Sequence, residues 1–268
     1  MGSVRPRPAE NIPMLSAVTA LLGIDTRLKL ARLFFVTDAR ARTGDLERVV
    51  SAAFAGGVDV VELVDARLDD RAELAALNTV RRVAQRHQGL VAVHKNPDLA
   101  GEFAADVLHL PADGVAARRA RRALHEYALI GRSCRSTTAF DAALADPDVN
   151  YLVADADPRS IEHAARVAPP SDPSSKPWFA AGGITLDSLD AVLSAGARRV
   201  AVSRAIARAD DPERAAAEFR ERLTAAWNAD PAMEAVTMAA FGGRKPLRDD
   251  EAFPGVVPPR RRGDEPAG

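Results

Sequence analysis

Two stretches of the chain carry residues that suit a phosphate group. Gly182 and Gly183 follow the apolar run PWFAA, and Ser203 and Arg204 follow the apolar run VAV. Glycine lets backbone N–H groups approach an oxyanion without a Cβ in the way, and the N-terminus of a helix adds a favourable partial charge. We therefore predict a phosphomonoester site at these four residues, with a plain glycine turn as the alternative interpretation.

Side chains for acid–base chemistry belong to two other apolar runs. Glu62 lies in VDVVELV, and His94 and Lys95 close the run LVAVHK. We predict catalytic roles for these three residues, because imidazole and carboxylate groups transfer protons and lysine can bind phosphate or form a Schiff base. For Lys95 we favour an ion pair with Glu62, because opposite charges at neighbouring strand ends neutralise each other.

A further polar group follows the run ALIG. Ser133 and Arg135 are candidate ligands of an anion, since hydroxyl and guanidinium groups donate hydrogen bonds to phosphate. Between them stands Cys134, whose pKa Arg132 and Arg135 can lower, although we favour a partly buried, inert thiol. As the only cysteine, Cys134 excludes an intramolecular disulfide and fits a reducing compartment, so we expect a cytoplasmic protein.

All of these residues lie in or just after apolar runs that alternate with helix-like segments. Such runs indicate buried parallel strands, because crossover helices cover both faces of the sheet. Eight strand–helix units in a chain of 268 residues predict the α/β class and a closed (β/α)8 barrel. The predicted strands are RLFFVT, VDVVELV, LVAVH, DVLHL, ALIGRS, VNYLVA, PWFAAG and RRVAVS.

The barrel is predicted over residues 31–228, with extensions at both ends. Residues 1–30 form an N-terminal extension with one short amphipathic helix in MLSAVTALLGI (Met14 to Ile24), because no small-residue cleavage site follows that run. Residues 229–268 hold one more helix in AMEAVTMAAF and a tail rich in proline, glycine and charge. We expect that tail to be disordered, since it has little apolar surface to bury.

Charge and metal-ligand spacing limit the classes of partner. The 36 Lys and Arg residues nearly balance the 37 Asp and Glu residues, so neither nucleic acid nor a membrane surface is the expected partner. The five histidines form no metal-binding spacing, and we expect neither a metal site nor an evident cofactor. A small phosphate-bearing molecule is the expected ligand, and an oligomer is compatible with the sequence.

Six segments together resemble the thiamine phosphate synthase / thiazole tautomerase family. They are ARLFFVTDAR, AGGVDVVEL, ADVLHL, LIGRS, KPWFAAGGI and AGARRVAVSRAI. The resemblance implies a (β/α)8 barrel and a synthase that joins hydroxymethylpyrimidine pyrophosphate to thiazole phosphate with Mg2+ on the pyrophosphate. It also implies that Gly182, Gly183 and Ser203 bind the thiazole phosphate. The tautomerase branch would need one general base, for which His94, Glu62 and Cys134 are the candidates.

The chain departs from the family pattern after the second strand. Where the family reads Gln-Leu-Arg-x-Lys, this chain has Glu62, Val64 and Ala66 at the amide and the two cationic positions. The two cations that would stabilise the departing pyrophosphate are therefore missing. Arg67 and Lys95 are the nearby cations that can compensate for them.

Further departures concern the metal ligands. The family's Asn-Asp-Arg is replaced by His94, Lys95 and Asn96, which puts a lysine at the position of a metal-binding aspartate. The second metal carboxylate falls on Gly114, with Asp113 beside it as the available substitute, and ADADPRS replaces a Thr-x-Thr-Lys loop. Because Mg2+ requires oxygen ligands, these changes argue against Mg2+-dependent pyrophosphate chemistry.

We therefore predict a thiamine-biosynthesis barrel that binds a thiazole phosphate or a similar phosphomonoester. If the chain is an enzyme, it is a transferase of the synthase type, with Mg2+, or an isomerase of the tautomerase type. A non-catalytic phospho-ligand-binding or regulatory paralogue is one alternative, and another phosphate-binding barrel isomerase is the other.

Overall fold

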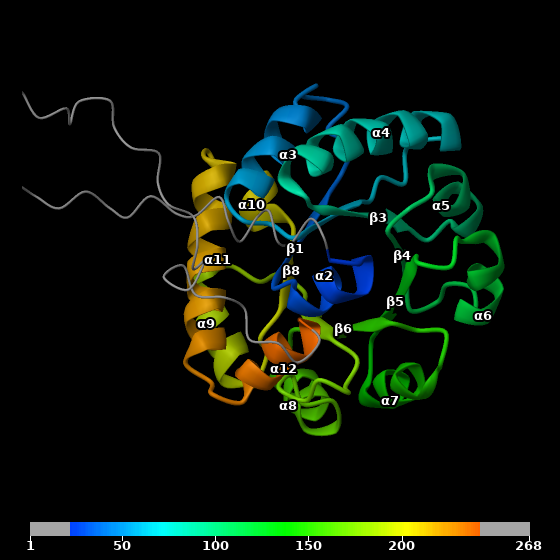
Figure 1. The fold of residues 1–268 in the computed structure, drawn as a ribbon. Helices are drawn as coiled ribbons and strands as arrows, with labels where there is room; N and C mark the ends of the chain where they lie inside the picture. The colour runs from blue at the N-terminus through cyan, green and yellow to red at the C-terminus, as the bar shows by residue number, and fades with distance from the viewer. Residues whose placement is uncertain (1–21, 242–268) are drawn as a thin grey trace, which may run out of the picture.

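The computed structural model describes residues 22–241, in which eight parallel strands close into a barrel surrounded by helices (Figure 1). Each strand pairs with its neighbours in sequence, and β8 pairs with β1 to complete the ring. This arrangement confirms the predicted (β/α)8 barrel. The strands are β1 (Leu33–Thr37), β2 (Val60–Leu63), β3 (Leu90–His94), β4 (Val107–Leu110), β5 (Leu129–Cys134), β6 (Tyr151–Asp155), β7 (Trp178–Ala181) and β8 (Val200–Val202).

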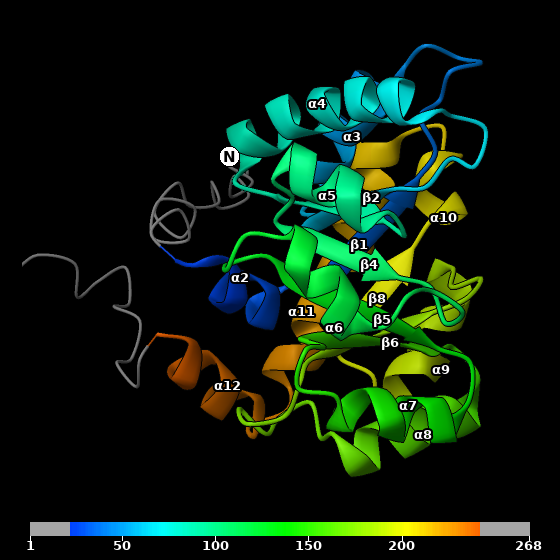
Figure 2. The same cartoon turned by 90° about the vertical axis from the view of Figure 1, so that its right-hand side faces the viewer.

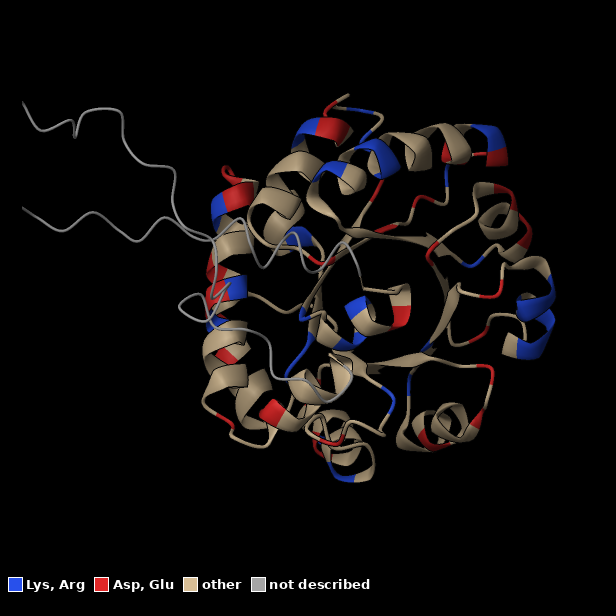
Figure 3. Ribbon diagram, in the orientation of Figure 1, with Lys and Arg blue, Asp and Glu red and all other residues tan. Residues whose placement is uncertain are grey.

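The helices that follow the strands cover the outside of the barrel. The side chain of Thr185 caps the helix Leu186–Ser194, and the side chain of Asp211 caps the helix that begins at Pro212. Acidic and basic residues are both scattered over these outer helices (Figure 3). The helices are α3 (Leu46–Ala55), α4 (Asp70–His87), α5 (Pro97–Phe103), α6 (Ala117–Ala120), η1 (Arg121–Ala123), α7 (Thr137–Ala145), α8 (Pro158–Val167), α9 (Leu186–Ser194), α10 (Arg204–Ala207) and α11 (Pro212–Asn228).

Apolar side chains pack in two layers, one between strands and helices and one inside the barrel. Because successive strand residues point to opposite faces, alternate positions of each strand fill the interior. Phe34, Tyr151 and Phe179 form an aromatic cluster there, with the Phe34 and Phe179 ring centroids 5.4 Å apart. The interior is therefore a packed core, and the polar residues above it form the floor of any site.

Two helices cover the amino-terminal end of the barrel. Leu28 of α2 (Ile24–Leu30) packs into the interior cluster, and α12 (Met233–Ala240) contacts α2. Figure 2 shows α2 and α12 at one end of the barrel and α10 at the other. The helix expected in Met14–Ile24 is not confirmed, because α2 begins at the last residue of that run and residues 1–21 lie outside the described residues. The expected C-terminal tail lies outside them from residue 242 onward.

None of the helices within residues 22–241 is both long enough and apolar enough to span a bilayer.

Candidate functional site

Four polar side chains lie at the carboxyl ends of neighbouring strands. The register pairs Glu62 of β2 with Ala92, His94 of β3 with His109 of β4, and His109 with Gly131, two residues before Ser133. Ala92 belongs to the interior cluster, so His94, two residues later, has the same inward orientation. Glu62, His94, His109 and Ser133 thus lie on the inward side of consecutive strands. The packed interior lies directly below them.

Glu62 and His94 form the central pair of this site. The Nδ1 atom of His94 lies 2.7 Å from Oε1 of Glu62, whose side chain is only 6% exposed. A carboxylate oxygen accepts hydrogen bonds and does not donate them, so Nδ1 carries a proton, and the lone pair of the neutral imidazole lies on Nε2. The His94 side chain is 27% exposed, and its Nε2 has no hydrogen-bond partner among the described residues. His94 is therefore oriented as a base at the mouth of the barrel.

His109 forms a second hydrogen-bonded group beside this pair. Its Nδ1 lies 2.9 Å from the Tyr151 hydroxyl and its Nε2 lies 2.8 Å from Oγ of Ser133. Burial lowers the pKa of His109, and burial also raises the pKa of Tyr151 well above its ordinary value. Both groups are therefore neutral at neutral pH.

The protons of this group can be assigned from the number of available partners. The Tyr151 hydroxyl is buried and has no acceptor other than Nδ1 of His109 among the described residues. If Nδ1 donated to Tyr151, the phenolic proton would be left unpaired, at a cost of about 1–3 kcal/mol. Tyr151 therefore donates to Nδ1, and Nε2–H donates to Ser133. The hydroxyl proton of Ser133 is left free for a ligand.

Tyr151 was not among the residues predicted from the sequence. It begins β6 and points inward, where a Cβ on Gly131 of β5 would come within 2.0 Å of its ring. Glycine at position 131 therefore makes the room that lets the tyrosine reach His109. The sequence signal that could have revealed this contact is the alternation of two strands, which points both Tyr151 of β6 and His109 of β4 into the barrel.

The predicted ion pair between Lys95 and Glu62 is wrong, since Glu62 pairs with His94. Lys95 is exposed, and its side chain makes no ion pair with any described residue. It follows the last residue of β3 with a φ of 68°, so the chain turns into the left-handed region there. His94 continues the inward alternation of the strand, which explains why it takes the partner that we assigned to Lys95.

The predicted phosphate-binding residues follow two adjacent strands. Gly182 and Gly183 come after β7, with φ values of 129° and 64°, and a Cβ on Gly183 would meet no atom within 4 Å. Ser203 and Arg204 come after β8, which pairs with β7 through Ala181 and Ala201. Ser203 and Arg204 are exposed, and neither side chain has a partner among the described residues. The glycine turn therefore leaves open space over exposed backbone next to a free hydroxyl and a free guanidinium.

The residues around Cys134 are less suited to binding a ligand. Arg132 donates hydrogen bonds to the carbonyl oxygens of Pro111 at 3.0 Å and Gly114 at 3.3 Å. Burial raises the pKa of the Cys134 thiol to about 12, and this effect outweighs the opposing charge of Arg132. The interpretation of Cys134 as an inert thiol is thereby supported. Arg135 is exposed and follows β5 directly, so it stays a candidate ligand by position.

The donor set beside β3 and β4 does not fit Mg2+. The two positions that would supply metal carboxylates carry Lys95 and Gly114, and Asp113 is a single exposed carboxylate. Mg2+ requires oxygen ligands, which neither a lysine ammonium nor a glycine provides as a side chain. Residues 22–241 contain no cluster of three or more histidine, cysteine, aspartate or glutamate residues in a metal-binding arrangement.

Arg67, the other cation expected to compensate, is already paired. Its guanidinium donates to both carboxylate oxygens of Asp65 at 2.8 Å and to Asp38 at 3.0 Å. These contacts neutralise its charge and hold it at the loop after β2.

Comparison with known proteins agrees with this architecture. Residues 33–206 match the family model described as thiamine monophosphate synthase. The thiamine-phosphate synthase of Thermobifida fusca is 46% identical over 210 residues, covering 75% of this chain and 95% of that protein. The thiamine-phosphate synthase of Streptomyces avermitilis is 42% identical over 205 residues, covering 74% of this chain and 95% of that protein.

Among solved structures, the thiamine phosphate pyrophosphorylase of Pyrococcus furiosus has the same fold. Its TM-score is 0.66 at 22% identity, and the match covers 75% of this chain and 98% of that one. The family model spans more than half of the chain, and the two curated relatives are matched over almost their whole length. The resemblance found in the sequence is thereby confirmed, and the chain belongs to the thiamine monophosphate synthase family.

Proposed function

We propose that this chain binds a thiazole phosphate or a similar phosphomonoester and transfers a proton on it without Mg2+. The observation that carries this proposal is the 2.7 Å contact between Nδ1 of His94 and Glu62, which leaves Nε2 of His94 free at the barrel mouth. Its setting is the cytoplasm, for which the single cysteine argues.

The phosphate is assigned to the carboxyl ends of β7 and β8. Gly182 and Gly183 supply open backbone, and Ser203 and Arg204 supply donors without other partners. In barrels of this type the loops after the seventh and eighth strands often bind phosphate. The free hydroxyl proton of Ser133 is a further donor across the mouth, directed by His109.

The chemistry assigned to the pair is a tautomerisation. Nε2 of His94 takes a proton from a carbon of the bound ring, and the Glu62 carboxylate stabilises the imidazolium that forms. The imidazolium then returns the proton to another atom of the same ligand, so that atoms and charge balance. No metal and no leaving group take part in this step.

The assay follows the conversion of a non-aromatic thiazole phosphate tautomer to the aromatic ring by absorbance, with EDTA present. His94→Gln is expected to lower kcat by about 10²–10⁴-fold, the usual contribution of a general base. His87→Gln is the matched control, because His87 is exposed at the end of α4 and its imidazole has no hydrogen-bond partner among the described residues. Equal rates for the wild type and His94→Gln would contradict the proposed base.

Binding is measured separately by calorimetric titration with thiazole phosphate. Gly183→Asp places a carboxylate in the open space above the turn and is expected to abolish binding by repelling the phosphate. Binding without conversion would favour the non-catalytic phospho-ligand-binding alternative. Absence of binding to the wild type would refute the phosphate site itself.

A second candidate function is the synthase reaction, which the names of the 46% and 42% identical relatives favour. It requires Mg2+ bound to the pyrophosphate, and the residues at positions 95 and 114 do not fit that ion. Formation of thiamine phosphate from both substrates with Mg2+, at an ordinary enzyme rate of about 1 s⁻¹ or more, would establish this function instead.

A further inference from the structure

An arginine-lined cleft lies beside the proposed phosphate site. Its volume is about 670 Å³, within the range of about 300–1,000 Å³ found for small-molecule sites. It opens between the loop after β1, the end of β2 and the segment from Ser203 to α10. The arginines that line it are Arg40, Arg42, Arg67, Arg204 and Arg208.

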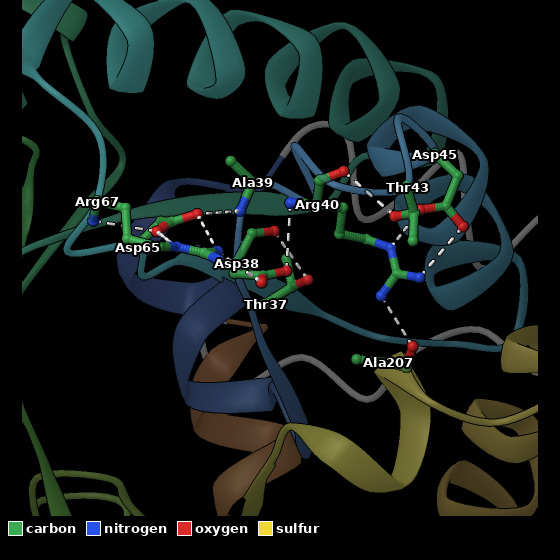
Figure 4. A network of polar contacts seen from close by, with 9 residues as sticks. All are labelled: Thr37, Asp38, Ala39, Arg40, Thr43, Asp45, Asp65, Arg67 and Ala207. Atoms are coloured by element: carbon green, nitrogen blue, oxygen red, sulfur yellow. Dashed lines mark hydrogen bonds and ion pairs between the residues drawn. The ribbon is translucent and has the colours of Figure 1, made fainter.

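Two of these arginines build the wall of the cleft. Nε and Nη2 of Arg40 donate to the two carboxylate oxygens of Asp45 at 2.6 and 3.1 Å, and Nη1 donates to the Ala207 carbonyl at 2.9 Å (Figure 4). Arg67 is bound to Asp65 and Asp38 in the same network. These contacts link the loop after β1 to α10 and to the loop after β2. The wall is thereby held in place before any ligand arrives.

The other three arginines are free to bind a ligand. Arg42, Arg204 and Arg208 are exposed, and none of them makes an ion pair or a side-chain hydrogen bond within residues 22–241. The acidic residue lining the cleft is Asp38, whose carboxylate accepts from Arg67 and from the backbone N–H of Arg40. The charges of Arg40 and Arg67 are matched by Asp45 and Asp65. With Asp38 counted as well, five guanidinium groups face three carboxylates, and the cleft keeps a net charge of +2.

We infer that this cleft binds the second phosphate group of a ligand that carries two, while the first phosphate of that ligand lies at the site after β7 and β8. The inference rests on the proposed function for the first phosphate, since the cleft and that site share Ser203 and Arg204. Arg42 and Arg208 then take the second phosphate, because a planar guanidinium donates two parallel hydrogen bonds to phosphate oxygens. Recognition by arginines needs no divalent cation, in agreement with the poor fit of Mg2+ elsewhere in the site.

Two kinds of compound carry two phosphate groups, and separate probes distinguish them. Inorganic pyrophosphate represents a diphosphate, and fructose 1,6-bisphosphate represents two phosphates joined by a carbon skeleton. Each is titrated into the full chain by calorimetry with EDTA present, and inorganic phosphate serves as the single-phosphate reference. The inference expects at least one of the two probes to bind more tightly than inorganic phosphate.

The decisive variants are Arg42→Ala and Arg208→Ala, with Arg119→Ala on α6 as the matched control. All three arginines are exposed and have no side-chain partner among the described residues, so folding is expected to be unaffected. Loss of a charged hydrogen bond should weaken the better two-phosphate probe by about tenfold in each cleft variant. Arg119→Ala should bind like the wild type, and no variant should change the affinity for thiazole phosphate.

Equal affinity of the two-phosphate probe for the wild type, Arg42→Ala and Arg208→Ala would overturn the inference. Binding of neither probe to the wild type would overturn it as well. Failure of the proposed function gives a different pattern. In that case thiazole phosphate does not bind, while the two-phosphate probe still loses affinity in Arg42→Ala and Arg208→Ala.

Discussion

Replacement of Tyr151 by phenylalanine tests the hydrogen-bonded group below the mouth of the barrel. The substitution removes one oxygen atom and keeps the ring, which packs against Phe34 and Phe179 at centroid distances of 6.1 and 5.9 Å. Packing is therefore almost unchanged. Nδ1 of the buried His109 loses its 2.9 Å partner, and no other described group can replace it.

The expected cost follows from that unpaired nitrogen. A buried polar atom without a partner costs about 1–3 kcal/mol, so Tyr151→Phe should lower the free energy of unfolding by that amount. For a domain of this size each kcal/mol corresponds to a shift of about 2–4 °C in Tm. Thermal unfolding followed by circular dichroism measures the change. Tyr127→Phe is the matched control, because Tyr127 is 69% exposed and should change stability by less than about 0.5 kcal/mol.

A second readout examines the assigned tautomer directly. In the wild type, ¹⁵N NMR should show the proton of His109 on Nε2, with Ser133 as its acceptor. In Tyr151→Phe, no donor fixes that tautomer, so Ser133 can donate to His109 in place of the ligand. Thiazole phosphate should then bind about tenfold more weakly. If Tyr151→Phe matches Tyr127→Phe in stability and His109 carries its proton on Nδ1 in the wild type, the assignment is refuted.

Three other changes should follow from burial and close packing. The pKa of the Cys134 thiol is about 12 in the folded chain against an ordinary 9.0, so the folded chain holds far less thiolate at pH 8. Iodoacetamide should therefore alkylate the folded chain about 10³-fold more slowly than the unfolded chain, as measured by mass spectrometry. The pKa of His109 in the folded chain lies below its unfolded value of 6.5, so the contribution of the neutral imidazole to stability is fully present above pH 6.5. Below pH 6.5 the free energy of unfolding should fall by up to about 1.4 kcal/mol per pH unit. Urea titrations should find a smaller slope in His109→Gln. Gly131→Ala puts a Cβ 2.0 Å from the Tyr151 ring and should cost about 1–3 kcal/mol in the same titrations. Gly23→Ala serves as the control for added volume, because a Cβ there meets nothing within 4 Å and the φ of Gly23 is -61°.

Most of the barrel could be predicted from the sequence because its strands are short apolar runs bounded by turn residues. The eight predicted runs contain β1 to β8 within a few residues. The helix caps at Thr185 and Asp211 also follow from local hydrogen bonding, which depends on residues three positions apart. Such features need no knowledge of the closed barrel.

Partners across the barrel were harder to predict. Tyr151 and His109 are 42 positions apart, and their contact exists only because β4, β5 and β6 are neighbours and Gly131 lacks a side chain. Charge alone favoured Lys95 as the partner of Glu62. The inward alternation of β3 selects His94, and the positive φ of Lys95 marks the point where the strand ends. Strand alternation is therefore a better guide than charge at such positions.

The pairing of Glu62 with His94 also changes how the departures from the family pattern are counted. A carboxylate that is only 6% exposed requires a partner, because an unpaired buried charge costs several kcal/mol. The family pattern has an amide at each of these two positions, and an amide can both donate and accept. Introducing Glu62 alone would leave its carboxylate without the donor that Nδ1 of His94 now provides. The two replacements therefore act as one change, which converts an uncharged pair into an oriented carboxylate–imidazole pair at the mouth of the barrel. That coupling favours a chemical role for His94 over chance variation at two tolerant sites.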